Sequence, residues 1–400
     1  MKKRSQIEAV ADFGFIIFVV TEAVFAHSRV GQLGLIFFFC TSFLLCLSKM
    51  KIKSNIFFFF SGIFILYNWL NIQVGISTVP DASMDLIWTL LINIISLVLL
   101  YNYVVLRNDP KRVIRNFTFA VLCITGWVMA LSMPSLLRGR LGSAAGINAN
   151  VLAFLSSNAL LMTLYLRITD KKTSYNLILI WFLMSTLLTG SRKGILIIAL
   201  GVVILMLLMF PQKRTRNLLL VCLGSILLWV SIMRVPILYQ IVGIRVEALM
   251  DLVQGGNIEE ASLRSRYNFI SQGWEYFLRN PWRGHGLDAF RYIRGYRHVY
   301  SHNNFIELLV SGGIIGFAIY YVNYLIILLR TFNEGKKGNS LAKLMFAIAV
   351  VMLVMDYAVV SYYGRLYQAL LVLTIGFTRI SKVQRKRNLD TNFATGENGS

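Results

Sequence analysis

The feature that most limits the fold of this chain is a series of apolar segments that recurs along most of its length. Twelve of them come close to or exceed the roughly 20 mostly apolar residues that a membrane-spanning helix needs. The 400 residues are 56% hydrophobic and only 14% charged, and the mean hydropathy is +0.64. A soluble fold has too little interior to bury so much apolar surface. We therefore predict an all-α polytopic membrane protein with about twelve transmembrane helices, near 9–26, 31–48, 55–74, 84–106, 117–136, 147–167, 174–189, 194–210, 217–235, 303–329, 341–361 and 364–380.

The chain is also strongly basic, with 40 Lys and Arg against 18 Asp and Glu and a formal charge of +22. A nucleic-acid-binding domain gathers its cations on one soluble face, whereas these cations are scattered between apolar segments. If the N-terminus is cytoplasmic, 25 cations fall on the inner side and 15 on the outer side. Positive charge in short loops marks the cytoplasmic side, so we predict that both termini are cytoplasmic and that the protein does not bind nucleic acid.

The two sides differ in residue type as well as in charge. The inner segments hold 14 Lys and 11 Arg, whereas the outer segments hold 14 Arg and a single lysine, Lys193. The planar guanidinium of Arg binds phosphate and carboxylate in a bidentate way. The outer arginines therefore indicate either an anionic ligand, such as a phosphate ester, or contacts with lipid headgroups. All four histidines also fall on the outer side, so any proton-transfer chemistry is expected there.

The predicted spans divide the chain into four parts. One external loop is too long for a plain connection, which makes it a candidate for function. The parts are spans one to nine (1–235), the external loop with amphipathic helices (236–301), spans ten to twelve (302–381) and a polar cytoplasmic tail (382–400).

Within the loop, residues 262–279 have the periodicity of an amphipathic helix. We expect this helix to lie on the membrane surface or on the outer ends of the spans. Arg266 lies at the edge of the apolar stripe, where its guanidinium can face a site, and Arg279 lies opposite the stripe, in solvent. The predicted stripe consists of Leu263, Tyr267, Ile270, Trp274, Phe277 and Leu278.

The tenth span opens with a polar segment. Ser301 is the predicted N-cap, which puts His302 in the first helical turn, where the helix dipole disfavours imidazolium. A neutral imidazole is what a general base requires. Glu307 lies on another face and is suited to orient a neighbour. The pair Gly313 and Gly316 allows helices to approach closely.

Other polar positions lie at predicted outer turns or inside spans. Arg192 stands at the start of the eighth span, where a helix N-terminus and a cation together can bind an anion; the alternative is an interfacial arginine in a turn. Asn148 and Asn150 enter the sixth span. Glu22 and Asp356 lie within spans, where acids are costly and are either functional or paired structural residues.

Four motifs resemble those of the O-antigen ligase and polysaccharide polymerase superfamily of bacterial envelope enzymes. In the order given below, and all on the predicted outer side, they cover roughly residues 140–320. They are Gly142-x-x-x-Gly146-Ile147-Asn148-Ala149-Asn150; Thr189-Gly190-Ser191-Arg192-Lys193-Gly194; Arg266 followed by Pro281 and Gly284-x-Gly286; and His302-Asn303-x-x-x-Glu307 followed by Gly313-x-x-Gly316.

The resemblance implies a fold like that of the C-type membrane glycosyltransferases, in the bacterial cytoplasmic membrane. It implies an undecaprenyl-diphosphate-linked oligosaccharide as donor and a growing glycan as acceptor, with a chain-length regulator or a flippase as protein partner. His302 would be the general base, and Arg192 and Arg266 would hold the diphosphate without a metal or other cofactor. The implied substrate-binding residues are Arg140, Asn148, Asn150, Arg264, Asn303 and Glu307.

Three activities fit these motifs to different degrees. A polymerase of lipid-linked repeat units is favoured over a ligase that moves a glycan onto lipid A-core or protein, although both share the donor, the base and the arginines. A lipid-linked sugar transporter is the alternative of another class. Such transporters often show paired halves, but this chain has no convincing half-to-half repeat, and its marked residues lie on one side. That favours an enzyme.

Overall fold

A computed structural model describes residues 2–26, 28–132, 140–143, 145–244, 247, 250, 261–293 and 299–394 of the protein. Every regular element within these ranges is a helix, which confirms the predicted all-α class. His27, Arg138 and His298, which the sequence places on the outer side, lie outside the described residues.

Each of the twelve predicted spans coincides with a helix. These helices are α1 (Lys2–Phe25), α2 (Arg29–Lys49), α3 (Ile56–Gln73), α4 (Pro80–Arg107), α5 (Pro110–Ser132), α6 (Ala149–Asp170), α7 (Tyr175–Leu188), α8 (Arg192–Met209), α9 (Arg214–Arg234), α14 (Asn304–Lys336), α15 (Ser340–Met355) and α16 (Arg365–Ala394). The segment between α9 and α14 contains α10 (Pro236–Leu238), the π-helix η3 (Tyr239–Gly243), α12 (Ala261–Arg279) and α13 (Ala289–Ile293).

Eight helices in the described ranges are long and apolar enough to cross a membrane, and α7 and α15 are apolar but shorter. The protein is therefore a multi-pass membrane protein. The last helix differs in length from its predicted span, because α16 runs on to Ala394 and makes the first part of the polar tail helical.

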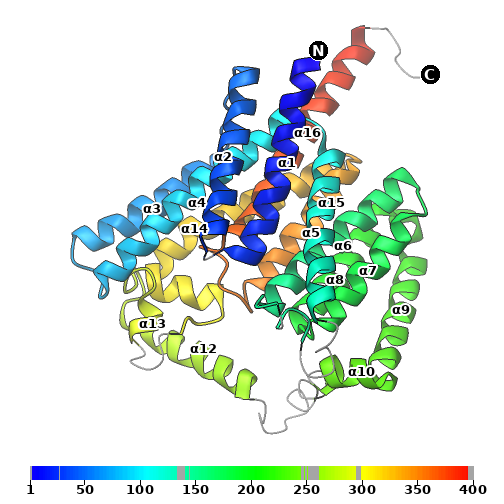
Figure 1. The fold of residues 1–400 in the computed structure, drawn as a ribbon. Helices are drawn as coiled ribbons and strands as arrows, with labels where there is room; N and C mark the ends of the chain where they lie inside the picture. Colours follow the sequence, from blue (N-terminus) through cyan, green and yellow to red (C-terminus); the bar gives the residue numbers. More distant parts are fainter. Residues whose placement is uncertain are drawn as a thin grey trace.

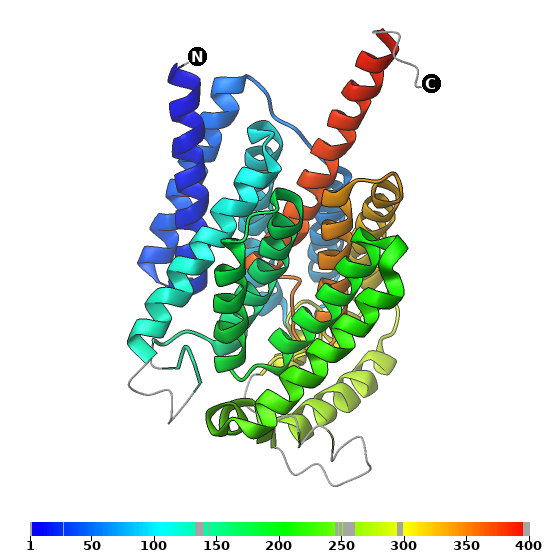
Figure 2. The same ribbon diagram turned by 90° about the vertical axis from the view of Figure 1, so that its right-hand side faces the viewer.

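The two ends of the helical bundle carry different parts of the chain. Both termini lie at one end, next to the beginning of α1 and the end of α16, and α10 and α12 lie at the opposite end (Figure 1). The view from the side shows the same separation (Figure 2). The segment predicted as the long external loop is therefore remote from the termini.

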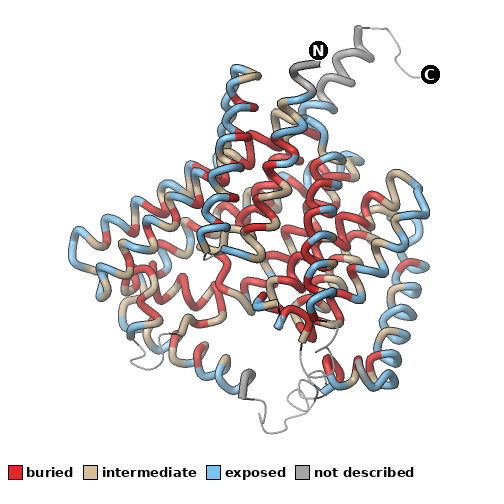
Figure 3. The backbone as a smooth tube through the Cα atoms, viewed as in Figure 1, coloured by how far each residue is buried: buried red, intermediate tan, exposed pale blue. Residues whose placement is uncertain are grey.

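The interior of the bundle is centred on α6. In its most apolar window 78% of the residues are buried, compared with 11% for the helix that includes α9. The same contrast is visible in Figure 3, where α9 is largely exposed. Ser156 of α6 hydrogen-bonds across the bundle to Thr186 of α7 at 2.9 Å. A fully packed α6 gives the residues at its N-terminus a fixed position.

Glu22, one of the two acids predicted inside spans, is paired with an arginine. Its carboxylate lies 2.6 Å from a guanidinium nitrogen of Arg365, and the same guanidinium donates from Nε to Asn93. The pair joins α1 to the start of α16.

Asp356, the second acid, is also bound within the protein. Its carboxylate accepts hydrogen bonds from Ser361 at 2.6 Å, Tyr321 at 2.9 Å and Asn304 at 3.2 Å. Because Asn304 is the first residue of α14, this network ties the end of α15 to the beginning of α14.

Helix α14 is broken at Gly313, whose φ of 61° and ψ of −166° lie outside the helical region. The break frees backbone groups that bond to the preceding loop: the N–H of Ile314 donates to Pro281, and the N–H of Gly286 donates to Ser311. A side chain at Gly313 would collide with the backbone of Trp282. The close approach at Gly313 therefore involves a loop and not a second helix. At Gly316 it does involve a second helix, because a Cβ there would lie 3.1 Å from the Tyr67 side chain of α3.

The amphipathic helix is confirmed in its bounds, but its predicted stripe is only partly buried. Three residues of the predicted stripe are exposed: Tyr267 at 66%, Trp274 at 50% and Leu278 at 57%. Phe277 and Ile270 of the stripe do pack in the cluster at the start of α14, together with Phe269, which lies outside the stripe. The side chain of Leu263 is not among those that the structure describes. The prediction treated the helix as having one apolar face, whereas its apolar residues cover two. Arg279 is exposed as predicted, and its guanidinium pairs with Glu275.

Candidate functional site

Two motifs that are far apart in the sequence are joined at the end of the bundle that carries α12. The guanidinium of Arg140 donates to the backbone oxygen of Thr189 at 2.6 Å and to the side-chain oxygen of Asn150 at 3.4 Å. The same amide oxygen accepts from the Ser191 hydroxyl at 2.9 Å. Arg140 and Asn150 thus hold the turn that leads directly into α8.

This turn depends on Gly190, whose φ of 60° lies in the left-handed region. A Cβ at this position would lie 2.6 Å from the backbone oxygen of Ile241. The chain therefore needs glycine here to reverse direction between α7 and α8. As predicted, Arg192 is the first residue of α8, with Ser191 at the N-cap position.

Lys193 follows Arg192 and lies within electrostatic range of Arg140, Arg192 and Arg266. Its side chain is half-buried, and it forms no ion pair or hydrogen bond with any described residue. Sequence reasoning left Lys193 out of the candidate set. The available signal was that it is the one lysine among the outer cations.

His302 lies beside this group of cations. Arg266 and Lys193 both act on its imidazole electrostatically, and its ring lies against those of Phe269 and Tyr300, with centroids 5.9 and 4.3 Å apart. The cations from α8 and α12 and the histidine before α14 therefore meet at one place. We call Arg140, Arg192, Lys193, Arg266 and His302 the outer cluster.

The imidazole of His302 is held in its neutral form. Burial, followed by the charges of Arg266 and Lys193, lowers the pKa of His302 from 6.5 to about 4. Its ring makes no hydrogen bond to a described residue. A neutral imidazole with an uncommitted nitrogen is suited to accept a proton from a bound molecule near neutral pH.

The reason predicted for this neutrality is wrong, because His302 does not lie in the first turn of α14. Asn303 is the N-cap, and its side-chain oxygen accepts from the N–H groups of Phe305 and Ile306. Ser301 bonds to Asn303 and does not cap the helix. His302 precedes the helix in a left-handed conformation, with φ of 58°.

Asn303 and Glu307 fix the backbone on both sides of His302. The carboxylate of Glu307 accepts from the N–H of Ser301 at 2.8 Å, and both Asn303 and Glu307 are buried, at 3% and 0% exposure. Left-handed backbone at a residue other than glycine persists only when its surroundings enforce it. These two residues are therefore placed to position His302.

A second group of polar residues, around Arg291, contacts the tyrosine that lies against His302. Sequence reasoning missed this group. Arg291 pairs with Asp288 at 2.9 Å, donates to the Tyr363 hydroxyl at 3.3 Å and lies 5.6 Å from the ring centre of Tyr300. Burial raises the pKa of Asp288, and the charge of Arg291 opposes that rise. Arg291 thus supports the tyrosine that contacts His302.

The remaining predicted residues lie elsewhere. Arg264 is exposed on α12. Asn148 caps α6 and lines a separate cavity of about 610 Å³ that also includes Glu22 and Arg365. His285 bonds to the backbone oxygen of Tyr276 at 2.8 Å. Among the described residues, no group of three His, Cys, Asp or Glu side chains is arranged to hold a metal ion.

Comparison with known families identifies one match. Residues 177–321 match the family described as O-Antigen ligase, which confirms the resemblance stated from the motifs. The matched residues include Arg192, Lys193, Arg266 and His302. Arg140, Asn148 and Asn150 precede the match, and the match assigns no role to any single residue. No curated protein matches the chain.

Proposed function

Because residues 177–321 carry the signature of the O-antigen ligase and polymerase superfamily, we propose that this protein polymerises undecaprenyl-diphosphate-linked repeat units of a surface polysaccharide. The reaction takes place at the outer face of the bacterial cytoplasmic membrane. The observation that carries this proposal is the outer cluster, in which Arg266 and Lys193 act on a neutral His302, and Arg140 and Arg192 lie within electrostatic range of Lys193.

A diphosphate fits the outer cluster electrostatically. Like charges held together in a partly buried site repel one another, and a ligand with more than one negative charge relieves that repulsion. The guanidinium groups of Arg192 and Arg266 offer bidentate donors to phosphate oxygens. Lys193 supplies a further positive charge on the same turn of α8. Arg140 acts mainly by holding this turn, since its guanidinium already bonds to Thr189 and Asn150.

His302 acts as the general base. The acceptor hydroxyl oxygen attacks the anomeric carbon of the donor sugar, and its proton passes to the uncommitted imidazole nitrogen. The bond between that carbon and the diphosphate oxygen breaks, and the electron pair leaves with the diphosphate. Fixed positive charges that stabilise the leaving group typically contribute several kcal/mol, or about a hundredfold to a thousandfold in rate per group. The chemistry therefore requires no metal ion.

The lipid chain of the donor has a matching groove. A cavity of about 420 Å³ between α7, α8 and α9 is lined almost entirely by aliphatic side chains. On α8 its lining residues include Ile195, Ile198, Val202 and Met206, which follow one face of the helix and begin just after Lys193. A lipid diphosphate bound at the outer cluster can therefore lay its chain along α8.

The orientation of the protein in the membrane follows from the charges. Lysine-rich segments mark the end that carries the termini, and the positive-inside rule assigns that end to the cytoplasm. Arg266 of the outer cluster belongs to α12, and α12 lies at the other end (Figure 1). We therefore propose that donor and acceptor meet on the outer face, after the repeat unit has crossed the membrane, with a flippase or a chain-length regulator as a partner.

Ligation is the second candidate function, because the family that matches residues 177–321 is described as O-Antigen ligase and its match does not separate ligation from polymerisation. A ligase would use the same donor, base and cations but transfer the glycan to lipid A-core or to a protein. Membranes supplied with lipid-linked repeat unit, with and without a lipid A-core acceptor, separate the two functions. Polymerisation gives longer lipid-linked glycans without added acceptor, and ligation gives products only with it.

The test of the site uses Arg266→Ala and His302→Ala, with Arg279→Ala as the matched control on the same helix. Arg279 is exposed, and its guanidinium pairs with Glu275 and lies over the Tyr276 ring of the same helix, so its loss should leave glycan length unchanged. We expect both site variants to lose long glycan while inserting into the membrane in normal amounts. Wild-type chain length in both would rule out the assigned roles.

A further inference from the structure

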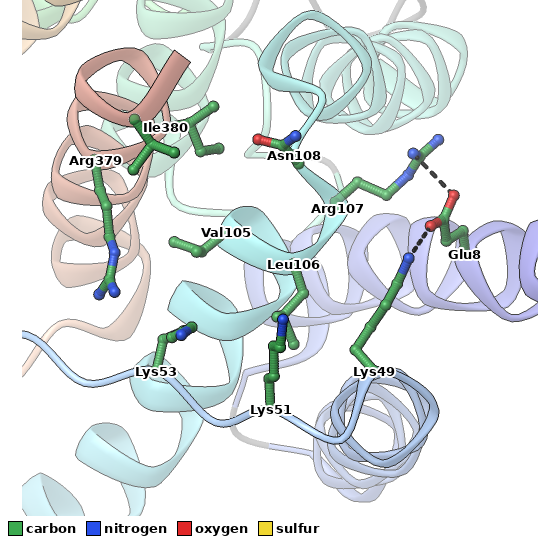
Figure 4. Close-up of a pocket in the computed structure, with 11 residues that line it drawn as sticks. Glu8, Lys49, Lys51, Lys53, Val105, Leu106, Arg107, Asn108, Arg379 and Ile380 are labelled. Carbon is green, nitrogen blue, oxygen red and sulfur yellow. Dashed lines mark hydrogen bonds and ion pairs between the residues drawn. The ribbon is translucent and has the colours of Figure 1, made fainter. Parts of the chain in front are cut away.

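The end of the bundle opposite the outer cluster contains a second group of cations, arranged around a cavity of about 790 Å³. The cavity lies between the ends of α2 and α4, the beginning of α1, the linker 50–55 and α16. Figure 4 shows three lysines projecting from the end of α2 and the linker toward the end of α4. Five basic and one acidic side chain line the cavity, a formal excess of +4. The basic residues are Lys49, Lys51, Lys53, Arg107 and Arg379.

Some of these cations are already bound by the protein and others are not. Glu8 pairs with Lys49 at 2.6 Å and with Arg107 at 3.2 Å. The side chains of Lys51 and Lys53 form no hydrogen bond or ion pair with any described residue. These two lysines therefore leave positive charge available to a ligand.

The linker that carries Lys51 and Lys53 is held in place. Asn102, which is 1% exposed on α4, accepts from the backbone N–H of Lys53 at 2.6 Å and donates to its backbone oxygen at 3.0 Å. Arg379 donates to the backbone oxygen of Ser54 at 2.9 Å. The positive-inside rule explains why cations are present in this region. It does not explain why the linker is hydrogen-bonded at two adjacent residues, Lys53 and Ser54, beside a cavity.

The cavity is also partly apolar. Val105 and Leu106 of α4 and Ile380 and Val383 of α16 line it together with the cations. A small soluble anion gains nothing from aliphatic contacts, whereas a phospholipid presents a phosphate next to hydrocarbon. Basic pockets between membrane helices are known to suit anionic headgroups.

We propose that this cavity binds the phosphate headgroup of an anionic membrane phospholipid, in the leaflet at the end of the protein that carries the termini. Lys51 and Lys53 contact the phosphate, and the aliphatic residues of α4 and α16 contact the adjoining glycerol and acyl carbons. This site is separate from the outer cluster and does not depend on which glycan the protein transfers.

The test measures lipid binding to the purified, detergent-solubilised protein by native mass spectrometry, with phosphatidylglycerol and phosphatidylcholine as probes. A lysine near an anionic headgroup contributes about fivefold in affinity. We therefore expect the double variant Lys51→Gln, Lys53→Gln to bind phosphatidylglycerol about 25-fold more weakly than wild type, with equal binding of phosphatidylcholine. Equal phosphatidylglycerol affinity in the two proteins would overturn the proposal.

A second pair of variants separates a built cavity from general positive charge. The control Lys172→Gln, Lys213→Gln removes two exposed lysines that do not line this cavity, and it should bind phosphatidylglycerol like wild type. Asn102→Ala keeps every charge but releases the linker, and it should weaken binding. A loss in the lysine control as large as in the cavity variant would contradict the proposal.

A third comparison separates a lipid from a soluble anion. Glycerol 3-phosphate and inorganic phosphate are supplied at the concentration at which phosphatidylglycerol saturates the protein, and thermal unfolding is followed. We expect only phosphatidylglycerol to raise the Tm of the wild type. If the soluble anions raise it equally, the ligand is not a lipid and the proposal fails. Monodisperse elution of every variant is the check that each has folded.

Discussion

The most demanding prediction concerns the acid limb of the pH–rate profile. The pKa of His302 lies at about 4 in place of 6.5, chiefly because the ring is buried. At pH 7 about one imidazole in 1,000 is then protonated, compared with about one in four for an ordinary histidine. A general base works only when unprotonated, so kcat/KM should stay level as the pH falls from about 6 to about 5. It should decrease only as the pH approaches 4.

The substitution Phe269→Ala tests whether burial of the ring is what lowers the pKa of His302. Phe269 is 7% exposed and its ring stacks on that of His302, with an interplanar angle of 11°. Removing it admits water to that side of the imidazole and favours the charged form. Burial and the charges of Arg266 and Lys193 lower the pKa together, so Phe269 accounts for only part of the change. We expect the acid limb to move upward from about 4 toward 6.5.

Phe277→Ala is the matched control for that perturbation. Phe277 is 6% exposed on the same helix and belongs to the same apolar cluster, so both variants should lose about 3–5 kcal/mol of stability. Only Phe269→Ala should shift the acid limb. The assay is kcat/KM for lipid-linked donor from pH 3.5 to 8. An acid limb near pH 6.5 in the wild type, or equal shifts of that limb in Phe269→Ala and Phe277→Ala, would show that burial by Phe269 does not lower the pKa of His302.

Three further predictions follow from single contacts. Lys193→Met should lower kcat/KM for the lipid-linked donor by about a hundredfold, because it removes a charge beside the diphosphate. The control Lys172→Met, on an exposed loop, should leave kcat/KM unchanged. Equal rates in the two variants would exclude Lys193 from the site. Glu307→Ala leaves the buried N–H of Ser301 without its acceptor, at a cost of about 1–3 kcal/mol, and should reduce kcat more than it changes KM. Glu307→Gln keeps an acceptor and should restore kcat, and failure of this rescue would show that the carboxylate does more than position His302. Asp356→Leu removes the acceptor of three buried hydrogen bonds, so its Tm should fall, and an unchanged melting curve would show that the network contributes nothing.

The helices were predictable because membrane spans are set by length and hydropathy, both of which are local in sequence. The bounds of α12 were predictable for a similar reason, since Asn280 and Pro281 end the helix. The face that it buries was not. Trp274 and Phe269 are both aromatic, and only the position of the broken α14 decides which of them is covered.

The site was predictable in its residue types and less so in its contacts. Arg192, Arg266 and His302 stood out because they are cations and a base on one side of the membrane. The bonds from Arg140 to Asn150 and Thr189 depend on how the helices pack, which no local pattern encodes. The wrong cap for α14 arose because Ser301 and Asn303 are both good N-cap residues and local sequence does not rank them.

The central claim is that the outer cluster forms glycosidic bonds by displacing a lipid diphosphate. The measurement that tests it most directly uses purified protein in liposomes, supplied with a defined undecaprenyl-diphosphate-linked repeat unit. It counts the glycosidic bonds formed and the undecaprenyl diphosphate released. We expect one diphosphate for each new bond in the wild type and neither product in His302→Ala. Repeat units that cross the bilayer without bond formation, or undiminished bond formation in His302→Ala, would contradict the claim.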